Sequence, residues 1–504
     1  MRRVPTAALI GALLALLTLA RLPSAWASGN ALNHVSGAWM ALADDLAHGL
    51  LYRPVRDPAL GFGGTRFFPL TFALEAVLFR AGLPLVVAGQ LLALAAGLSA
   101  ALGAAHFLRR AGHTLPAAAG LGALPLAGFA GQLGLASARG DLPAAALSIW
   151  GLSCLLPDPR RPGARTVGKG GIAAVLFVLA FLAKPTALAA AAAGTAFLWR
   201  SGERGPAVRL TMRVAVGCAL ALAAVDVLSA GRFHELLGGL GTGGAHLAGL
   251  VHAPLRLAEV MVREDPAGLV LLAAAGSALL GRHPSAAARS PALLLASLWL
   301  ASSLATVLAV LASPGTGVNH LLELEAAAAL LAGSALSPPR TRLAGPGGLS
   351  RLVSAAAALA AAVSLFTSAA AWRRDRAGSR IAEAREALDA AREGAPAPLL
   401  SEDPLVPLLG GERPFALDAW MLRIEADRDP TVAAALVERL RNGGFRAVVL
   451  LRAVDAPDAE EWFSHELGSA ALAEIRQRWR PALAVGPYHV YRFAEAGPPS
   501  ERLP

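Results

Sequence analysis

The sequence is poor in charge for its length. Only 16% of its 504 residues are Asp, Glu, Lys or Arg, whereas 55% are hydrophobic, and a soluble protein averages roughly 25% charged residues. Apolar runs of about 18 or more residues recur along the chain, which is the signature of helices that cross a bilayer. The scarcity of charge therefore argues against an ordinary soluble enzyme and predicts a multi-pass membrane protein.

Cysteine and lysine are also scarce. Cys154 and Cys218 both fall within apolar runs, and the chain has no CxxC or HExxH pattern, so neither a disulfide framework nor a familiar zinc site is predicted. Lys169 and Lys184 are the two lysines among 45 basic residues. The net charge of +10 is spread over short loops, which favours membrane topology over nucleic-acid binding as its cause.

The apolar runs predict about eleven transmembrane helices. They are expected near residues 6–24, 84–108, 115–134, 142–156, 169–183, 185–199, 209–230, 266–281, 290–312, 317–336 and 351–371. The first is interpreted as an uncleaved span anchored by Met1-Arg2-Arg3, although Ala25-Trp26-Ala27 would also suit a signal-peptide cleavage site.

Basic residues concentrate in the short loops on one side of the predicted membrane, as the positive-inside rule requires. Counting 67–81 as a further span would invert every later loop and move these basic loops outside. The segment is also short and contains Glu75, so we predict a helix that lies on or dips into the outer face. The loop before it, with the stretch GFGGTRFFPL at 61–70, is then outside.

Three segments are predicted to be large and outside. The first covers residues 25–83, and the second covers 231–265 with an amphipathic pattern at 246–263. The third is the polar tail, where helical runs alternate with the strand-like runs RAVVLL and YHVYRF. We therefore predict an α-helical transmembrane module over 1–372 and an extracytoplasmic α/β domain over 373–504.

Ionisable residues at membrane depth are costly and often functional. Asp141 follows Arg139 at the outer mouth of a span, where its carboxylate could act on a substrate or simply cap the helix. Lys184 sits at the outer turn between two short spans, where it could bind a phosphate or extend to the interface.

A second polar group opens the span at 317–336. Asn319 and Glu323 are four residues apart and share a helix face. At least one of Glu323 and Glu325 should face a cavity, because a carboxylate in lipid is costly. His320, which directly follows Asn319, is interpreted as a structural hydrogen-bonding residue.

The first outside loop offers two acids on a helix predicted from about 35 to 48. Asp44 and Asp45 could form the solvated face of this helix. Alternatively, either could act as a general base or a metal ligand at the membrane surface.

In their order, these pieces resemble the glycosyltransferase C (GT-C) superfamily, specifically its protein-mannosyltransferase-like, family 39-like members that use polyprenyl-phosphate sugars. The resemblance rests on the motifs A..L..G..YRP, G.RFFPL, RGDLPAAALSIWGL, LAKPTAL, GVNHLLEL and PAPLLSEDPLVPLLGGERP. It covers most of the chain. It implies that GFGGTRFFPL leads into an interfacial helix beside the place where a lipid-linked donor and an acceptor meet.

The resemblance also implies an acidic base early in the first loop and a second acid before the fourth span. Asp141 matches the second place. The first place falls near Asn33 and His34, which are not acidic. Either His34, Asp44 or Asp45 would then act as the base, or the chain would have lost activity; a neutral imidazole is a competent base near pH 7.

The function that the resemblance implies is sugar transfer from a polyprenyl-phosphate donor to a lipid, glycan or protein acceptor, on the outer face of the plasma (inner) membrane. Lys184, Arg66 and Arg139 would hold the leaving phosphate, with Asn319 and Glu323 completing the substrate site. A divalent Mg²⁺ or Mn²⁺ ion would suit a phosphate leaving group beside carboxylates.

Two other functions stay open at the level of sequence. A secondary transporter also keeps buried acids and broken helices, but transporters usually show repeated halves, and this sequence shows no such repeat. A catalytically inactive relative would account for the missing acid in the first loop.

Overall fold

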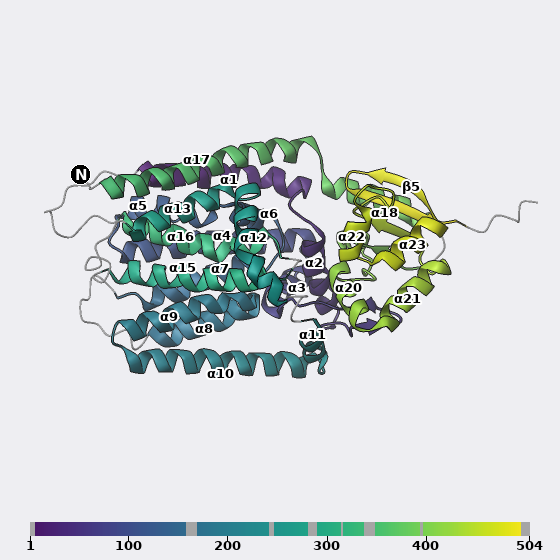
Figure 1. Cartoon of the computed structure of the whole chain (residues 1–504), viewed down its shortest axis with the longest axis horizontal. Coiled ribbons are helices and arrows are strands. Elements are labelled where there is room, and N and C mark those ends of the chain that lie inside the picture. The colour runs from purple at the N-terminus through teal and green to yellow at the C-terminus, as the bar shows by residue number, and fades with distance from the viewer. Residues whose placement is uncertain are drawn as a thin grey trace, which may run out of the picture.

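The computed structural model describes residues 6–157, 169–240, 246–280, 290–313, 316–336, 348–393 and 397–494. A bundle of long helices lies beside a smaller unit that carries the main sheet (Figure 1). The first helix begins at the end of the bundle that is far from this smaller unit (Figure 1).

The bundle consists of apolar helices at the predicted spans. They are α1 (Thr6–Ser28), α4 (Leu85–Arg110), α7 (Asp141–Leu155), α8 (Lys169–Ala183), α9 (Leu188–Arg200), α10 (Arg204–Leu228), α13 (Pro266–Leu280), α15 (Pro291–Val310), α16 (Leu322–Ala335) and α17 (Gly348–Ala377). Among the described residues, five helices are long and apolar enough to cross a membrane, and three shorter apolar helices accompany them. The chain is therefore a multi-pass helical membrane protein, while the number of eleven spans stays a prediction.

The structure breaks the span that was predicted at 115–134. α5 (Leu115–Leu121) and the 3-10 turn η1 (Leu124–Leu126) meet α6 (Phe129–Ala136) at a bend of 84°. Pro125 lies in this turn, and a proline cannot donate the backbone hydrogen bond that a continuous helix needs. The amide of Ala130 instead donates to Asp265 Oδ2 at 3.4 Å, which satisfies part of the new helix start.

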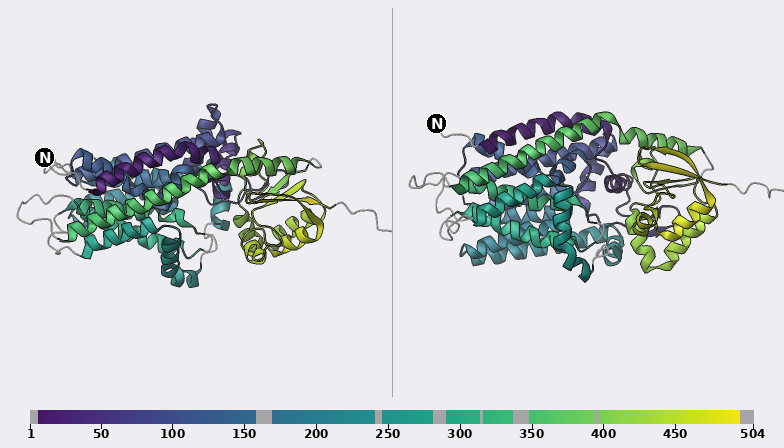
Figure 2. Two further views of the ribbon diagram at one scale, coloured as in Figure 1. Left: turned by 90° about the horizontal axis from the view of Figure 1, so that it is seen from above. Right: turned by 45° about the horizontal axis from the view of Figure 1, so that its top comes forward.

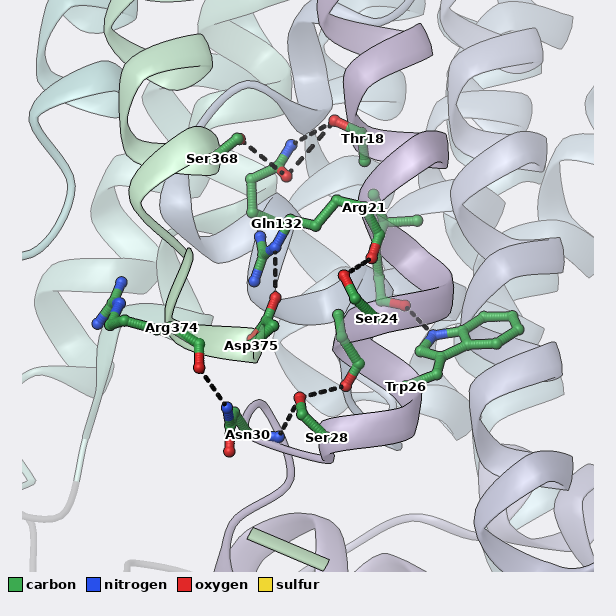
Figure 3. Close-up of polar contacts among 12 residues, drawn as sticks. Thr18, Arg21, Ser24, Trp26, Ser28, Asn30, Gln132, Ser368, Arg374 and Asp375 are labelled. Carbon is green, nitrogen blue, oxygen red and sulfur yellow. Dashed lines mark hydrogen bonds and ion pairs between the residues drawn. The ribbon is translucent and has the colours of Figure 1, made fainter. Parts of the chain in front are cut away.

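α1 and α17 lie side by side and are joined by buried polar contacts (Figure 3). Arg21 Nε lies 2.8 Å from Asp375 Oδ2. Further along, Gln132 Nε2 of α6 donates to Thr18 Oγ1 at 3.2 Å, and Ser368 Oγ donates to Gln132 Oε1 at 3.4 Å. These bonds satisfy polar groups that lipid cannot satisfy. They fix α17, which leads to the tail, against the first helix of the chain.

The first predicted outside segment folds over the ends of the bundle helices nearest the smaller unit. α2 (His34–Ala47) packs on α3 (Pro69–Arg80), and α3 also contacts α4 and α8. The Trp39 ring of α2 stacks on Phe67 at 4.7 Å between ring centroids. Both helices occur where the sequence predicted them.

Shorter elements connect the bundle helices. They are η3 (Pro185–Ala187), α11 (Arg232–Leu240), α12 (Leu247–Arg263) and η4 (Val318–Leu321). The predicted amphipathic helix is α12, which stands out from the side of the bundle near the smaller unit (Figure 2). Gly249 brings α12 close to α15, because a Cβ there would lie 2.2 Å from the Ala312 carbonyl oxygen.

The smaller unit is formed by the tail, which begins after α17 ends at Ala377. Its four-stranded sheet has the order β3-β4-β6-β5, with β3 (Leu399–Ser401) parallel to β4 (Ala447–Leu450) and the pairs of β6 (Tyr488–Phe493) with β4 and with β5 (Trp479–Val485) antiparallel. Its helices are α18 (Arg380–Arg392), α19 (Leu405–Leu408), α20 (Ala419–Arg428), α21 (Pro430–Arg441), α22 (Ala459–His465) and α23 (Ser469–Arg478). The two strands predicted from RAVVLL and YHVYRF are β4 and β6.

The stretch GFGGTRFFPL joins this tail to the first loop. β1 (Arg56–Asp57) and β2 (Gly61–Phe62) form a small antiparallel pair. Phe62 N donates to Phe415 O at 2.7 Å, and Leu417 N donates to Phe62 O at 3.1 Å. Gly61 has a φ of +79°, and a Cβ there would lie 2.1 Å from the Phe415 carbonyl oxygen, so this close approach needs glycine. We call this junction between residues 53–62 and 413–417 the seam.

Candidate functional site

A polar cavity opens at the end of the bundle that faces the tail, and we call it the Asp141 cavity. It is lined by Asp141, Ala144, Lys184, Thr186, Ser303, Thr306, Val307, Asn319, His320, Leu322 and Glu323. The volume inside it is about 20 Å³, and the cavity is open to the outside at its mouth. Four of the residues predicted from the sequence, Asp141, Lys184, Asn319 and Glu323, therefore line one space although they come from three separate segments.

Asp141 lies at the centre of a polar network that joins these segments. Its Oδ1 forms an ion pair with Lys184 Nζ and accepts a hydrogen bond from Asn319 Nδ2 at 3.0 Å. The residue at the N-cap of α7 is Gly140, and Asp141 is already in the first turn. The carboxylate thus holds side chains from two other segments instead of serving only as the cap of its own helix.

Lys184 follows the last residue of α8 and points into the cavity. Its side chain is 16% exposed and bound to Asp141, so it does not extend freely to the interface. An ammonium group held at the rim of a cavity is a point charge that a phosphate can share.

Several further cationic or donor groups surround Asp141. Arg139, Lys184 and His320 lie within electrostatic range of its carboxylate, and Arg66 lies within range of His320. Among the described atoms, Arg139 Nε and His320 Nδ1 are buried without a hydrogen-bond partner. Buried polar atoms are nearly always paired in native proteins, and a polar ligand or a water molecule beside these two atoms would satisfy them.

Glu323 and Glu325 lie in two different environments. Glu323 lines the Asp141 cavity, and its Oε1 accepts a hydrogen bond from Ser148 Oγ at 2.9 Å. Glu325 is fully buried beside Asp265 and Gly128, away from the cavity lining. Glu323 is therefore the acid that faces the cavity, as expected for at least one of the pair.

His34 lies in the first turn of α2, between the bundle and the tail. Asn33 caps the helix by accepting a hydrogen bond from Ser36 N at 3.2 Å, which leaves the imidazole free of a capping role. Arg139 of the bundle and Asp418 of the tail both lie within electrostatic range of it. Burial lowers the pKa of His34 below its usual value, so the imidazole is neutral at pH 7 and able to accept a proton.

Asp44 and Asp45 do not line the Asp141 cavity. Asp45 is fully buried at the seam, where Arg53 Nε and Nη2 lie 2.5 and 3.0 Å from its two oxygens. Arg53 Nη1 also donates to Pro414 O of the tail at 2.6 Å. Asp44 instead lies 3.4 Å from His48 Nδ1 of its own helix. The Asp45 carboxylate is sealed in a structural contact, so we do not carry it into the proposed mechanism.

Two residues received no functional role in the sequence reasoning. His320 was interpreted as structural, and Asp418 was not considered. Asp418 caps α20 by accepting from Met421 N at 3.1 Å, and it lies within electrostatic range of both His34 and Arg66. No local pattern identifies Asp418, because the seam brings it to the first loop from more than 350 positions away.

The donor set does not fit a resident divalent metal ion. Within the part of the chain that the structure describes, no three His, Cys, Asp or Glu side chains come together as a metal site. The Asp141 carboxylate is already engaged by Lys184 and Asn319. We therefore derive no step through Mg²⁺ or Mn²⁺.

No protein-family model matches the sequence, and no curated protein is similar to it in sequence. Solved structures do share its architecture. ArnT from Cupriavidus metallidurans bound to undecaprenyl phosphate has a TM-score of 0.54 at 15% identity, over 97% of this chain and 98% of that one.

Two structures of an archaeal enzyme are also similar. The Archaeoglobus fulgidus oligosaccharyltransferase in complex with Zn and sulfate has a TM-score of 0.57 at 15% identity, over 96% of this chain and 73% of that one. The oligosaccharyltransferase AglB from Archaeoglobus fulgidus, in complex with an inhibitory peptide and a dolichol-phosphate, has a TM-score of 0.56 at 13% identity, over 98% and 74%. The fold is therefore shared with membrane glycosyltransferases, as the GT-C resemblance predicted.

Proposed function

We propose that this chain is a membrane glycosyltransferase that takes its sugar from a polyprenyl-phosphate donor. The observation that carries the proposal is the Lys184 ammonium in the lining of the Asp141 cavity, with Arg139 within electrostatic range of Asp141 and its Nε left without a partner among the described atoms. Arg66 lies within electrostatic range of His320, which also lines the cavity. Arginine and lysine are the usual ligands of phosphate. Two proteins of the same fold have been crystallised or solved with undecaprenyl phosphate and dolichol-phosphate, which supports the same class of donor here.

The donor would bind with its phosphate among these cations and its sugar at the mouth of the Asp141 cavity. Asn319, Glu323, Ser303 and Thr306 line the cavity and offer both hydrogen-bond donors and acceptors to sugar hydroxyl groups. The polyprenyl chain would stay in the bilayer beside the apolar helices. Asp141 holds Lys184 and Asn319 in place for these contacts.

We assign the proton-accepting role to His34. A carboxylate that already accepts from an ammonium and an amide is a weak base, which disfavours Asp141, whereas the His34 imidazole has no such partner among the described contacts. The acceptor oxygen would form a bond to the anomeric carbon as the bond from that carbon to the phosphate oxygen breaks, with inversion. The hydroxyl proton would pass to His34, and the charge on the leaving phosphate would be stabilised by Arg66, Arg139 and Lys184.

We place the reaction on the extracytoplasmic face of the plasma (inner) membrane, with the tail on the same side. The basic residues of the short loops support this orientation. α1 starts at the end of the bundle far from the tail, and α17 runs beside it toward the tail (Figure 1), which agrees with an odd number of crossings.

One observation favours a second function, namely donor binding without turnover. The place that the resemblance assigns to a first-loop acid holds Asn33 and His34. An inactive relative would bind polyprenyl phosphate in the same cavity but release no product.

Two experiments test the proposal: deletion of the gene in cells, and reconstitution of the purified protein in lipid vesicles. We expect a polyprenyl-phosphate sugar to accumulate in cells that lack the protein, because its consumer is absent. Purified protein in lipid vesicles should then convert that lipid to polyprenyl phosphate and a glycosylated acceptor. Unchanged lipid-linked sugars would contradict transfer, and binding without release of polyprenyl phosphate would favour the inactive relative.

A further inference from the structure

We infer that α12 docks on the lipid surface, with one exposed face lying in the bilayer leaflet next to the tail. The proposed function gives α12 no part, and the inference does not depend on sugar transfer. It follows from the way in which three kinds of side chain divide the surface of this helix.

One face of α12 is apolar and exposed, and we call it the apolar stripe. Its members follow one another at intervals of four, four and seven residues, which places them on one side of a helix; they are Leu247, Val251, Leu255 and Val262. Each is between 62% and 85% exposed. Contiguous apolar patches are rare on surfaces that meet water, and they mark places where a protein meets a membrane or a partner.

A second face of α12 is charged and also exposed. His252, Glu259 and Arg263 form it, and Arg263 Nη1 lies 2.6 Å from Glu259 Oε1. Helical geometry places this face about a quarter of a turn around the axis from the apolar stripe. A helix that lies at a bilayer surface has this division, with apolar side chains toward the acyl chains and charged side chains toward water.

The third face of α12 packs on the bundle and fixes the direction of the other two. Gly249 lies against Ala312, where no side chain would fit. Arg256 Nη1 donates to Leu311 O at 3.2 Å and to Ser313 O at 2.8 Å. The helix therefore cannot roll about its axis and turn the apolar stripe toward the bundle without breaking these contacts.

The same contacts place α12 at the depth of a bilayer surface. α15 is long and apolar enough to cross a membrane and ends at Val310, so the carbonyl groups that Arg256 binds lie just beyond the end of a span. α12 runs across the direction of the bundle helices (Figure 2), as a helix in the plane of a membrane does.

The neighbouring helices favour lipid over protein as the occupant of this face. α12 contacts both α13 and α15, and these two apolar helices expose Leu269 and Leu304 near the same end of the bundle. The apolar stripe therefore extends the surface through which the bundle meets lipid. A protein partner would have to displace that lipid to reach the stripe.

Spin labels on single cysteines test the inference. Cys154 and Cys218 of the full-length protein are replaced by alanine, and one cysteine is then introduced by Val251→Cys or Leu255→Cys in the apolar stripe. The matched control is Glu259→Cys, one helical turn from Leu255. Each labelled protein is reconstituted in vesicles of phosphatidylethanolamine and phosphatidylglycerol. Collisions of the label with molecular oxygen, which partitions into acyl chains, and with a water-soluble nickel complex are measured by EPR.

We expect the ratio of oxygen to nickel collisions to be several-fold higher at both positions of the apolar stripe than at Glu259→Cys. Similar ratios at all three positions, with nickel collisions frequent, would show that the stripe meets water and would overturn the inference. Protection of the stripe from both reagents would show that a protein surface covers it, which would overturn the inference as well.

A second measurement uses the wild-type protein and needs no substitution. It is reconstituted in the same vesicles with a phospholipid that carries a photoreactive group on its acyl chain, and the crosslinked residues are identified by mass spectrometry. We expect crosslinks to residues of the apolar stripe and none to His252, Glu259 or Arg263. Crosslinks to the bundle helices without any to the apolar stripe would contradict docking of α12 on lipid.

Discussion

The seam and the Asp141 cavity each contain a buried ion pair, but the two pairs have different surroundings. At the seam, every guanidinium nitrogen of Arg53 has a partner, either Asp45 or a backbone carbonyl oxygen. In the cavity, the Asp141–Lys184 pair borders open volume, and polar atoms of Arg139 and His320 lack partners among the described residues. A buried charge pair alone therefore does not identify a ligand site; open volume and unsatisfied donors beside the pair do.

The largest expected effect is on transfer in Asp141→Asn. The amide cannot hold the Lys184 ammonium as a carboxylate does, so we expect transfer to fall by about 10²- to 10³-fold. The Lys184 ammonium faces the cavity, where water can solvate it in the absence of the Asp141 carboxylate. The apparent melting temperature in detergent should therefore change little. Asp45→Asn at the seam should show the opposite pattern, with a fall in the apparent melting temperature as its main effect. Near-normal transfer by Asp141→Asn would contradict a functional role for the ion pair in the Asp141 cavity, and with it the contrast to the structural pair at the seam.

The next effect concerns stability at the seam. Arg53→Met removes both close hydrogen bonds to the buried Asp45 carboxylate and leaves it Arg413, whose Nε lies 3.4 Å from Asp45 Oδ1. Breaking a buried pair costs about 3–5 kcal/mol when no partner remains, so we expect a loss of stability that approaches this range. The control is Arg56→Met, whose pair with Asp429 has side chains 48% and 32% exposed and contributes about 0–1 kcal/mol. Unfolding in detergent and limited proteolysis between the tail and the bundle measure both. Equal stability of the two variants would contradict the structural role of the Asp45–Arg53 pair.

Local patterns predicted much of the fold. Helical periodicity placed α2, α3 and α12, and alternating strand residues placed β4 and β6. The same patterns missed the bend before α6, because Pro125 is hidden within an otherwise uniform apolar run. Hydropathy averages over a window, whereas one missing backbone donor is enough to break a helix.

The site was predictable only in part. Asp141, Lys184 and Asn319 stood out because polar residues are rare at span ends, and the structure brings them into one network. Asp44 and Asp45 looked alike in sequence, since a helical pattern does not show that Arg53 seals one of them. Asp418 gave no signal, because its place depends on backbone pairing between distant segments.

The most direct test of the account is the affinity for undecaprenyl phosphate of wild type, Lys184→Met and Lys169→Met. The two lysines lie at opposite ends of α8, so the same substitution is made near the Asp141 cavity and far from it. One charge-assisted phosphate contact contributes about 1.5–3 kcal/mol. We therefore predict that Lys184→Met binds roughly ten- to a hundredfold more weakly, while Lys169→Met binds like wild type. Equal affinity of all three proteins, with Lys184→Met normally folded, would contradict the assignment of Lys184 to the donor phosphate.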